Sequence, residues 1–206
     1  MSDTAILDVN ATLHHGDIIL FSGQTLFSHS IRNFTNSRWS HCGMAVFDKR
    51  YDANVQIWDV SKKTFGGEVA LYDLQSRIAA YKGAIAYRPL YQASQQRGLT
   101  AQHTADFSAI YNDLVGRPYE TSKLELFNAA FDATLFDYEL ARNDPDLTSI
   151  FCGELVAETY QRLGLLDSKT PSNEYVPADF GKNRDLPLNK GYYFGNETAL
   201  KDANAQ

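Results

Sequence analysis

The stretch WSHCGMAVF, residues 39–47, joins an apolar run to a single histidine, His41. Aromatic and β-branched residues fit the half-buried surface of a pleated sheet, so this run predicts a strand. A second apolar run, VQIWDV at residues 55–60, follows a charged connector at residues 48–54, which predicts an antiparallel hairpin. The histidine sets the first strand apart, because a buried imidazole needs a polar partner.

Two acids are candidates for the partner of His41. Asp59 stands in the otherwise apolar second run, and Glu68 follows a pair of glycines. Asp59 is the preferred candidate, since it can orient the ring from the neighbouring strand; an edge strand with Asp59 facing water is the alternative. Adjacent side chains of a strand point to opposite faces, so Cys42 should face the core if His41 faces a site.

A cysteine opens the strongest helical pattern of the chain, FCGELV at residues 151–156. Apolar residues recur at helical spacing from Cys152 to Leu163, and Gly164 is placed as a C-terminal cap. The start of a helix and a neighbouring imidazolium both lower the pKa of a thiol. The sequence therefore offers Cys152 as a nucleophile, with His41 as its base and Gly153 leaving room for a substrate. A buried core cysteine is the alternative.

The remaining patterns predict a mixed α and β domain. Further strands are expected at residues 18–22 and 83–88, and further helices at residues 26–34 and 100–114. A helical segment at residues 121–149 is interpreted as a lid, and the last residues are expected to be frayed. Because a chain of 206 residues without repeats can bury one core, we expect a single domain over residues 1–206.

Composition argues against several classes of partner and cofactor. The net charge of −6, with no basic cluster interleaved with aromatic residues, argues against nucleic acid. We find neither a signal peptide nor a membrane span in the sequence, so a cytoplasmic setting is the default, and export without an N-terminal signal stays open. Two cysteines give no disulfide framework and no closed zinc spacing, so we expect no metal and no organic cofactor.

The other histidines are interpreted as surface residues. His14 and His15 precede a turn, and with Asp17 they are considered as a metal site, but a solvated turn is the favoured interpretation. His29 and His103 lie in polar surroundings and are also expected at the surface.

Five segments, taken in order, resemble a known family. GDIILF at residues 16–21, WSHCGMA at 39–45, GRPY at 116–119, FCGELV at 151–156 and VPADF at 176–180 are similar to the circularly permuted branch of the NlpC-type papain-like cysteine hydrolases. Its YiiX-like group is the nearest match, and lecithin-retinol acyltransferase is a relative. The resemblance covers about residues 13–181, which would be the core of the domain, and permutation accounts for a histidine that precedes the cysteine.

This resemblance implies a papain-like α+β fold, in which an antiparallel sheet or small barrel packs against helices. Cys152 would be the nucleophile at a helix N-terminus, His41 the base and Asp59 the third catalytic residue. The family more often has Glu at the third position and Ser after the cysteine, where this chain has Asp59 and Gly153.

Two further residues take roles from the same resemblance. Tyr119, in a Gly-x-Pro-Tyr element, would support the oxyanion or the substrate, with a packed aromatic after a turn as the alternative. Glu154 is interpreted as structural.

The reaction implied is that of a cysteine hydrolase of the amidase or peptidase type. Such an enzyme cleaves an amide, ester or thioester through a covalent acyl-cysteine intermediate. The substrates implied are peptides, or lipid and acyl groups. An acyltransferase and a catalytically silent binding module are the alternatives.

Overall fold

The computed structural model describes residues 8–48, 50, 52, 54–60, 67–118 and 151–202. Tyr119 and the lid predicted at residues 121–149 lie outside these residues, so their predicted roles stay predictions.

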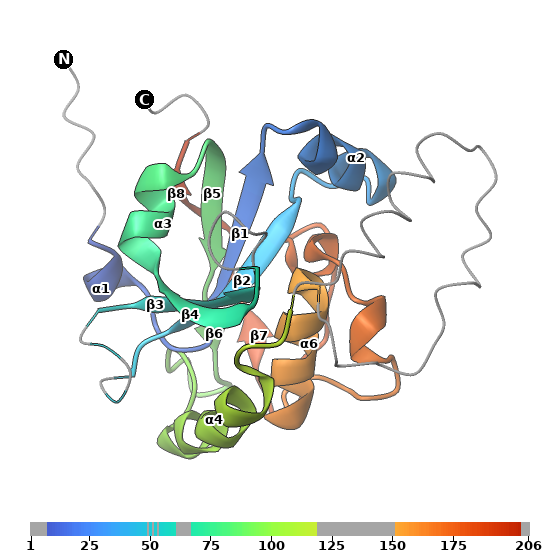
Figure 1. Cartoon of the computed structure of the whole chain (residues 1–206). Coiled ribbons are helices and arrows are strands. Elements are labelled where there is room, and N and C mark those ends of the chain that lie inside the picture. The colour runs from blue at the N-terminus through green and yellow to red at the C-terminus, as the bar shows by residue number, and fades with distance from the viewer. Residues whose placement is uncertain are drawn as a thin grey trace.

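A six-stranded antiparallel sheet forms the centre of the molecule, with the strand order β4-β3-β2-β1-β5-β8 (Figure 1). Its strands are β1 (Ile18–Gly23), β2 (His41–Val46), β3 (Gln56–Val60), β4 (Val69–Asp73), β5 (Gly83–Arg88) and β8 (Thr198–Lys201). A separate two-stranded pair joins β6 (Leu90–Tyr91) to β7 (Tyr193–Phe194). The predicted hairpin is confirmed as β2 and β3, which pair antiparallel with Met44 opposite Trp58.

Helices connect and cover these strands. They are α1 (Val9–Thr12), α2 (Leu26–Phe34), α3 (Leu74–Ala80), α4 (Ala101–Leu114) and α6 (Cys152–Arg162), with 3₁₀ turns η3 (Ser172–Glu174) and η4 (Pro177–Phe180). Side chains fix three of the starts: Thr25, Asp73 and Thr100 each accept a hydrogen bond from a backbone N–H in the first turn of α2, α3 and α4.

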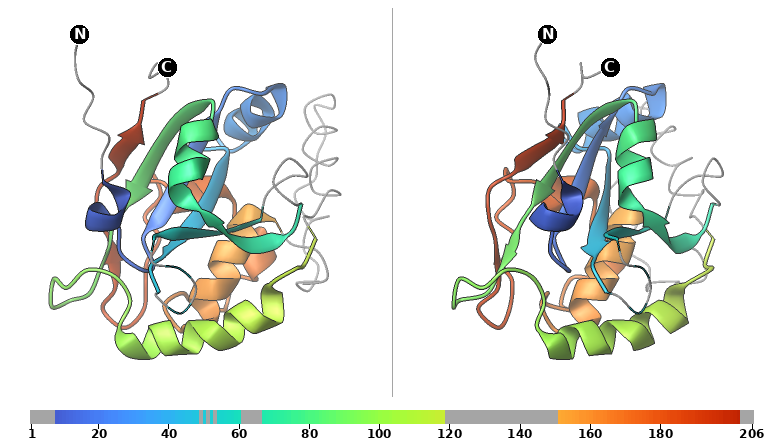
Figure 2. Two further views of the ribbon diagram at one scale, coloured as in Figure 1. Left: turned by 60° about the vertical axis from the view of Figure 1, so that its left-hand side comes forward. Right: turned by 90° about the vertical axis from the view of Figure 1, so that its left-hand side faces the viewer.

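The sheet separates two apolar layers because alternate residues point to opposite faces. In β1 and β2, Leu20 and Met44 belong to the layer that packs against α4 and α6. Ile19 and Ala45 belong to the layer that packs against α1 and α3. Figure 2 shows α3 on one side of the sheet and α4 and α6 on the other. The molecule is therefore an α+β structure, as expected from the sequence.

The C-terminal segment continues into a strand. Residues 198–201 form β8 on the edge of β5, whereas residues 203–206 lie outside the described part, so the expectation that the last residues are frayed stays a prediction. Glu197 accepts hydrogen bonds from Nε1 of Trp39 at 2.8 Å and from the backbone N–H of Lys182 at 2.7 Å. Lys201 donates to the backbone carbonyls of Ile78 and Tyr81 at 2.9 and 2.8 Å. These bonds hold the tail against the sheet.

None of the helices in the described ranges has the length and apolar character that a membrane span requires.

Candidate active site

Cys152 is the first residue of α6 and is 1% exposed. Phe151 precedes it in an extended conformation, and the carboxylate of Glu154 accepts a hydrogen bond from the Phe151 backbone N–H at 3.3 Å. This bond closes the first turn of the helix, which supports the interpretation of Glu154 as structural. The thiol therefore lies at the positive end of an eleven-residue helix.

His41 begins β2 and meets Asp59 on the neighbouring strand β3. Nε2 of His41 lies 2.8 Å from Oδ1 of Asp59, and Oδ2 of Asp59 accepts a hydrogen bond from Arg77 on α3 at 2.7 Å. At this distance the carboxylate forms an ion pair with the protonated imidazole. The ring of Phe21 packs on the imidazole with centroids 5.3 Å apart.

The structure decides between the two acids considered for His41. Asp59 is completely buried, so the alternative of an edge residue facing water is wrong. Glu68 is exposed and forms an isolated bridge with Pro118. Asp59 is thus the carboxylate that contacts the imidazole.

The structure also brings Cys152 to His41. The thiol of Cys152 lies beside the imidazole, close enough for each group to shift the pKa of the other. Because Nε2 faces Asp59, Nδ1 is the ring nitrogen available to the sulfur. Cysteine, imidazole and carboxylate therefore form a connected series in space although they come from α6, β2 and β3.

Cys42 is a neighbour that the sequence did not reveal. As the alternation of the strand predicts, it is fully buried in the layer beneath α6. Cys152 belongs to this same layer, and the Cys42 thiol is close enough to that of Cys152 to lower the pKa of Cys152. No spacing rule relates a strand cysteine to a cysteine on a distant helix, so only the packing shows the contact.

The charges of the site favour a thiolate and an imidazolium. Burial alone would raise the pKa of Cys152, but the contact with Cys42 and the charge of His41 outweigh burial and lower it to about 5. Burial alone would lower the pKa of His41, but the charges of Asp59 and Cys152 raise it to about 10. Burial and the contact with Cys152 raise the pKa of Cys42 well above its ordinary value. Between about pH 5 and about pH 10, Cys152 therefore carries the negative charge and His41 carries the proton.

Arg77 is a second residue that sequence reasoning missed. Burial would raise the pKa of Asp59, but His41 and Arg77 together lower it. Arg77 thereby keeps the carboxylate ionised beside the imidazole. It lies in α3, a helix for which no prediction was made.

The sequence suggested that Gly153 leaves room for a substrate, but the space beside it is filled. A Cβ at this position would lie 2.4 Å from the carbonyl oxygen of Tyr175 and 2.9 Å from Cα of Val176. The glycine instead lets the chain between η3 and η4 approach the start of α6.

Two histidines expected at the surface are buried. His15 is 6% exposed and His103 is 9% exposed, whereas His14 and His29 are exposed as expected. His15 is buried because α4 packs over it and the ring of Phe107 lies against its imidazole. The local sequence around His15 gives no sign of this contact, since α4 is distant in the chain.

Comparison with known proteins identifies the fold. No protein-family model matches the chain, and no curated protein matches it in sequence. Among solved structures, an α+β protein of the same fold is similar over most of the length. It is the metalloprotein YiiX from Escherichia coli O157:H7, with a TM-score of 0.57 and 20% identity over 90% of this chain and 97% of that chain. The chain therefore has a YiiX-like fold.

Proposed function

We propose that this protein is a cysteine hydrolase of the circularly permuted papain-like type. The observation that carries the proposal is the contact of Cys152, at the start of a helix, with an imidazole that a buried carboxylate orients. A nucleophile, a base and a third group that orients the base are the arrangement from which covalent acyl transfer proceeds.

In the proposed mechanism, the thiolate of Cys152 attacks the carbonyl carbon of an amide, ester or thioester. The carbonyl oxygen becomes an oxyanion, to which the Cys152 backbone N–H at the start of α6 donates. The imidazolium of His41 gives its proton to the leaving group, and an acyl-cysteine remains. His41 then removes a proton from water, which attacks the thioester and releases the acid. Tyr119 is proposed to support the oxyanion or the substrate.

The metal content of the structural neighbour does not enter this mechanism. YiiX is described as a metalloprotein, but the described residues of this chain contain no group of three or more His, Cys, Asp or Glu side chains that could hold a metal ion. We derive no step through a metal.

Alkylation by iodoacetamide tests the proposal, because a small electrophile can reach a cysteine that is only 1% exposed more readily than a large substrate can. Mass spectrometry would measure the rate at Cys152 from pH 4 to pH 10, in the wild type and in His41→Ala. We expect alkylation to follow an apparent pKa of about 5, and to follow a higher pKa in the variant. Cys152→Ala controls for reaction at Cys42.

A second measurement tests turnover itself. Incubation with a panel of aryl esters, thioesters and amides should add an acyl mass to Cys152 and release the acid, and Cys152→Ala should do neither. Rapid alkylation without any acyl adduct would show that the thiol is activated but would contradict the proposal that the protein is a hydrolase. Slow alkylation that is independent of His41, in a folded protein, would contradict both.

A further inference from the structure

A hollow lies beside the turn that follows α2. It is open to solvent, and its volume of about 590 Å³ is in the size range of small-molecule sites. Polar side chains line it, namely Arg32, Asn33, Asn36, Ser37, Arg38 and Asn183. Two of these side chains carry a positive charge, and none of the described lining residues is acidic. In a chain with a net charge of −6, the hollow is therefore a local concentration of positive charge.

The turn after α2 brings the two arginines to the same hollow. Asn36 has a φ of 46°, the left-handed conformation with which helices commonly end. The backbone N–H of Ser37 reaches back and donates to the carbonyl oxygen of Arg32 at 3.0 Å. Arg38 follows directly, so the chain places it near the last turn of α2. The same bond occupies a carbonyl oxygen that would otherwise repel an anion at this end of the helix.

Uncharged groups hold both arginines in place. The guanidinium of Arg38 lies over the ring of Trp39, with Cζ 4.5 Å from the ring centroid, and this indole is fixed in the core. Arg32 donates to the hydroxyl of Ser22 at 3.1 Å and to Nδ1 of His29 at 2.8 Å. Neither arginine pairs with a carboxylate of the described residues. Both guanidinium groups are thus positioned while their charge stays uncompensated.

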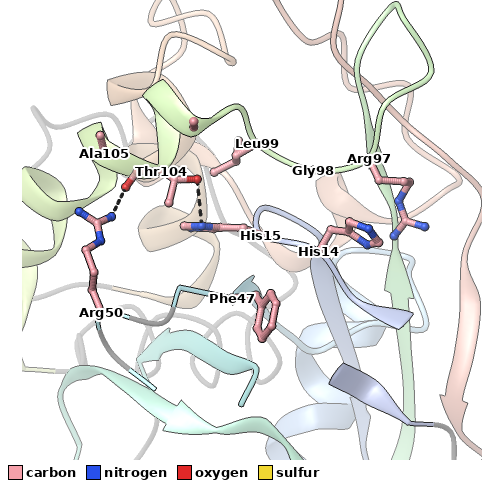
Figure 3. Close-up of a pocket in the computed structure, with 10 residues that line it drawn as sticks. His14, His15, Phe47, Arg50, Arg97, Gly98, Leu99, Thr104 and Ala105 are labelled. Carbon is pink, nitrogen blue, oxygen red and sulfur yellow. Dashed lines mark hydrogen bonds between the residues drawn. The ribbon is translucent and has the colours of Figure 1, made fainter. Parts of the chain in front are cut away.

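The hollow drawn in Figure 3, beside the start of α4, has the opposite arrangement. Arg50 and Arg97 lie on opposite sides of it. Arg50 pairs with Asp48 and Arg97 with Asp17, so carboxylates of the protein already neutralise both. A ligand anion would have to compete with these internal partners. At the turn after α2, two arginines share a hollow without such competition.

Three asparagines add neutral donors to this lining. The side chains of Asn33, Asn36 and Asn183 are exposed, and their amides have no hydrogen-bond partner among the described residues. Guanidinium groups bind phosphate through paired N–H donors. Two of them match the two negative charges of a phosphate group, whereas a carboxylate carries one. The lining therefore favours phosphate.

The hollow adjoins the candidate active site. Arg38 precedes His41 by three residues, so their Cα atoms are at most about 11 Å apart. Ser22, which accepts from Arg32, follows Phe21, whose ring packs on His41. Figure 1 shows α2 beyond the end of the sheet at which β1 finishes and β2 begins. A molecule bound here through a phosphate group can therefore extend towards the imidazole.

We propose that this hollow is a binding site for a phosphate group. Its oxygen atoms accept hydrogen bonds from Arg32 and Arg38 and from the neighbouring amides. The phosphate is either the free ion or part of an organic molecule, and the experiment below distinguishes these sources. The inference is independent of the proposed hydrolase activity, because its test measures binding alone.

Inorganic phosphate is the probe, and acetate at the same ionic strength, which carries a single charge, is its control. Titration of the ¹⁵N-labelled protein at pH 7.5 should give saturable NMR shifts at residues 33–38 and 183 and at the indole N–H of Trp39. Because water and salt screen the charges of an open site, we expect a Kd of about 1 mM. Acetate should bind at least about tenfold more weakly.

Matched variants show whether the shifts come from this hollow. Arg38 lines the hollow, whereas Arg184, one residue beyond Asn183, does not, and both arginines are exposed. Arg38→Gln should weaken phosphate binding at least about tenfold, and Arg184→Gln, with the same loss of charge, less than about twofold. Asn36→Gly keeps the left-handed turn and removes one amide, so it should weaken binding about threefold.

Phenyl phosphate distinguishes the two sources of phosphate, because it carries the charged group on an apolar body. Tighter binding of phenyl phosphate than of inorganic phosphate, lost in Arg38→Gln, would assign the hollow to an organic phosphate. Equal or weaker binding would assign it to the free ion. Both results support the phosphate site.

Three results would overturn the proposal. They are equal binding of acetate and phosphate, phosphate binding that Arg38→Gln weakens no more than Arg184→Gln does, and the absence of saturable shifts up to about 20 mM phosphate. Because Arg38 and Arg184 are exposed, we expect both variants to fold, so the comparison between them remains informative.

Discussion

At the scale of single residues, the contact between the thiols of Cys42 and Cys152 makes a testable contribution to reactivity. We expect the Cys42 S–H to donate to the Cys152 thiolate, and a hydrogen bond to a charged group is worth about 1.5–3 kcal/mol. Cys42→Ala should therefore raise the pKa of Cys152 by about one to two units and slow its alkylation at pH 6. Cys42→Ser keeps a donor of similar size and should restore most of the rate. If Cys42→Ala and Cys42→Ser have the same pH profile, the thiol of Cys42 does not act on Cys152 as a donor.

The carboxylate of Asp59 should control the protonation of His41. Its charge helps to raise the pKa of His41 to about 10, so the imidazolium is retained below that pH and lost above it. In Asp59→Asn we expect this pKa to fall by several units, so that His41 becomes neutral at a much lower pH. NMR titration of the His41 ring protons measures this directly. An unchanged His41 titration would show that Asp59 does not hold the proton there.

The same substitution should cost stability, because it removes the charge that Arg77 contacts at 2.7 Å in a buried position. Breaking a buried ion pair typically costs about 3–5 kcal/mol. Thermal unfolding of Asp59→Asn at pH 7 should therefore show a clearly lower melting temperature. The NMR titration of His41 in this variant must then be done well below that temperature, so that loss of folding is not mistaken for a change in the His41 pKa.

At the scale of elements, the start of α6 depends on the absence of a side chain at Gly153. Glycine to alanine in a helix normally stabilises by up to about 1 kcal/mol. Here the added Cβ would meet backbone atoms of Tyr175 and Val176, which cannot rotate away as a side chain can. Gly153→Ala should therefore lower the melting temperature and slow alkylation of Cys152, because α6 must shift. A higher melting temperature with normal alkylation would show that the chain at residues 175–176 yields easily.

The elements with a strong pattern could be predicted from the sequence, and those fixed by packing could not. Periodicity gave α2 at its observed bounds and α4 within a residue, and apolar runs gave β1, β2, β3 and β5. Strand β4 and helix α3 were missed because β4 is mostly half-buried and has a weak apolar pattern. Strand β8 was missed because Thr198–Lys201 has no strand-like apolar pattern, and because the strand with which it pairs, β5, is distant in sequence.

The residues of the candidate site also fall into those that the sequence could predict and those that it could not. Local sequence signals point to Cys152, His41 and Asp59, namely a thiol at a helix start and two polar residues in apolar runs. Cys42 and Arg77 carry none, since their importance arises only when α6 and α3 pack on opposite faces of the sheet. Tyr119 lies outside the described residues, and its role remains a prediction.

At the scale of the whole molecule, Glu197 links the C-terminal segment to the core. Its carboxylate accepts from the indole of Trp39, which is 2% exposed, and from the backbone of Lys182. Glu197→Ala should lower the free energy of unfolding by about 1–3 kcal/mol, whereas Glu197→Gln, which retains an acceptor, should lose less. Urea unfolding measures both values. Equal stability of the wild type and both variants would mean that β8 holds the tail without help from this residue.

The order of the segments along the chain has a consequence for synthesis on the ribosome. His41 and Asp59 emerge early, but the thiol that meets them follows residues 60–151, which take roughly ten seconds to translate. Until α6 emerges and packs on the sheet, Cys152 has neither a helix start nor an imidazolium beside it. The nascent chain therefore carries an ordinary thiol, which becomes activated only after α6 has emerged and packed.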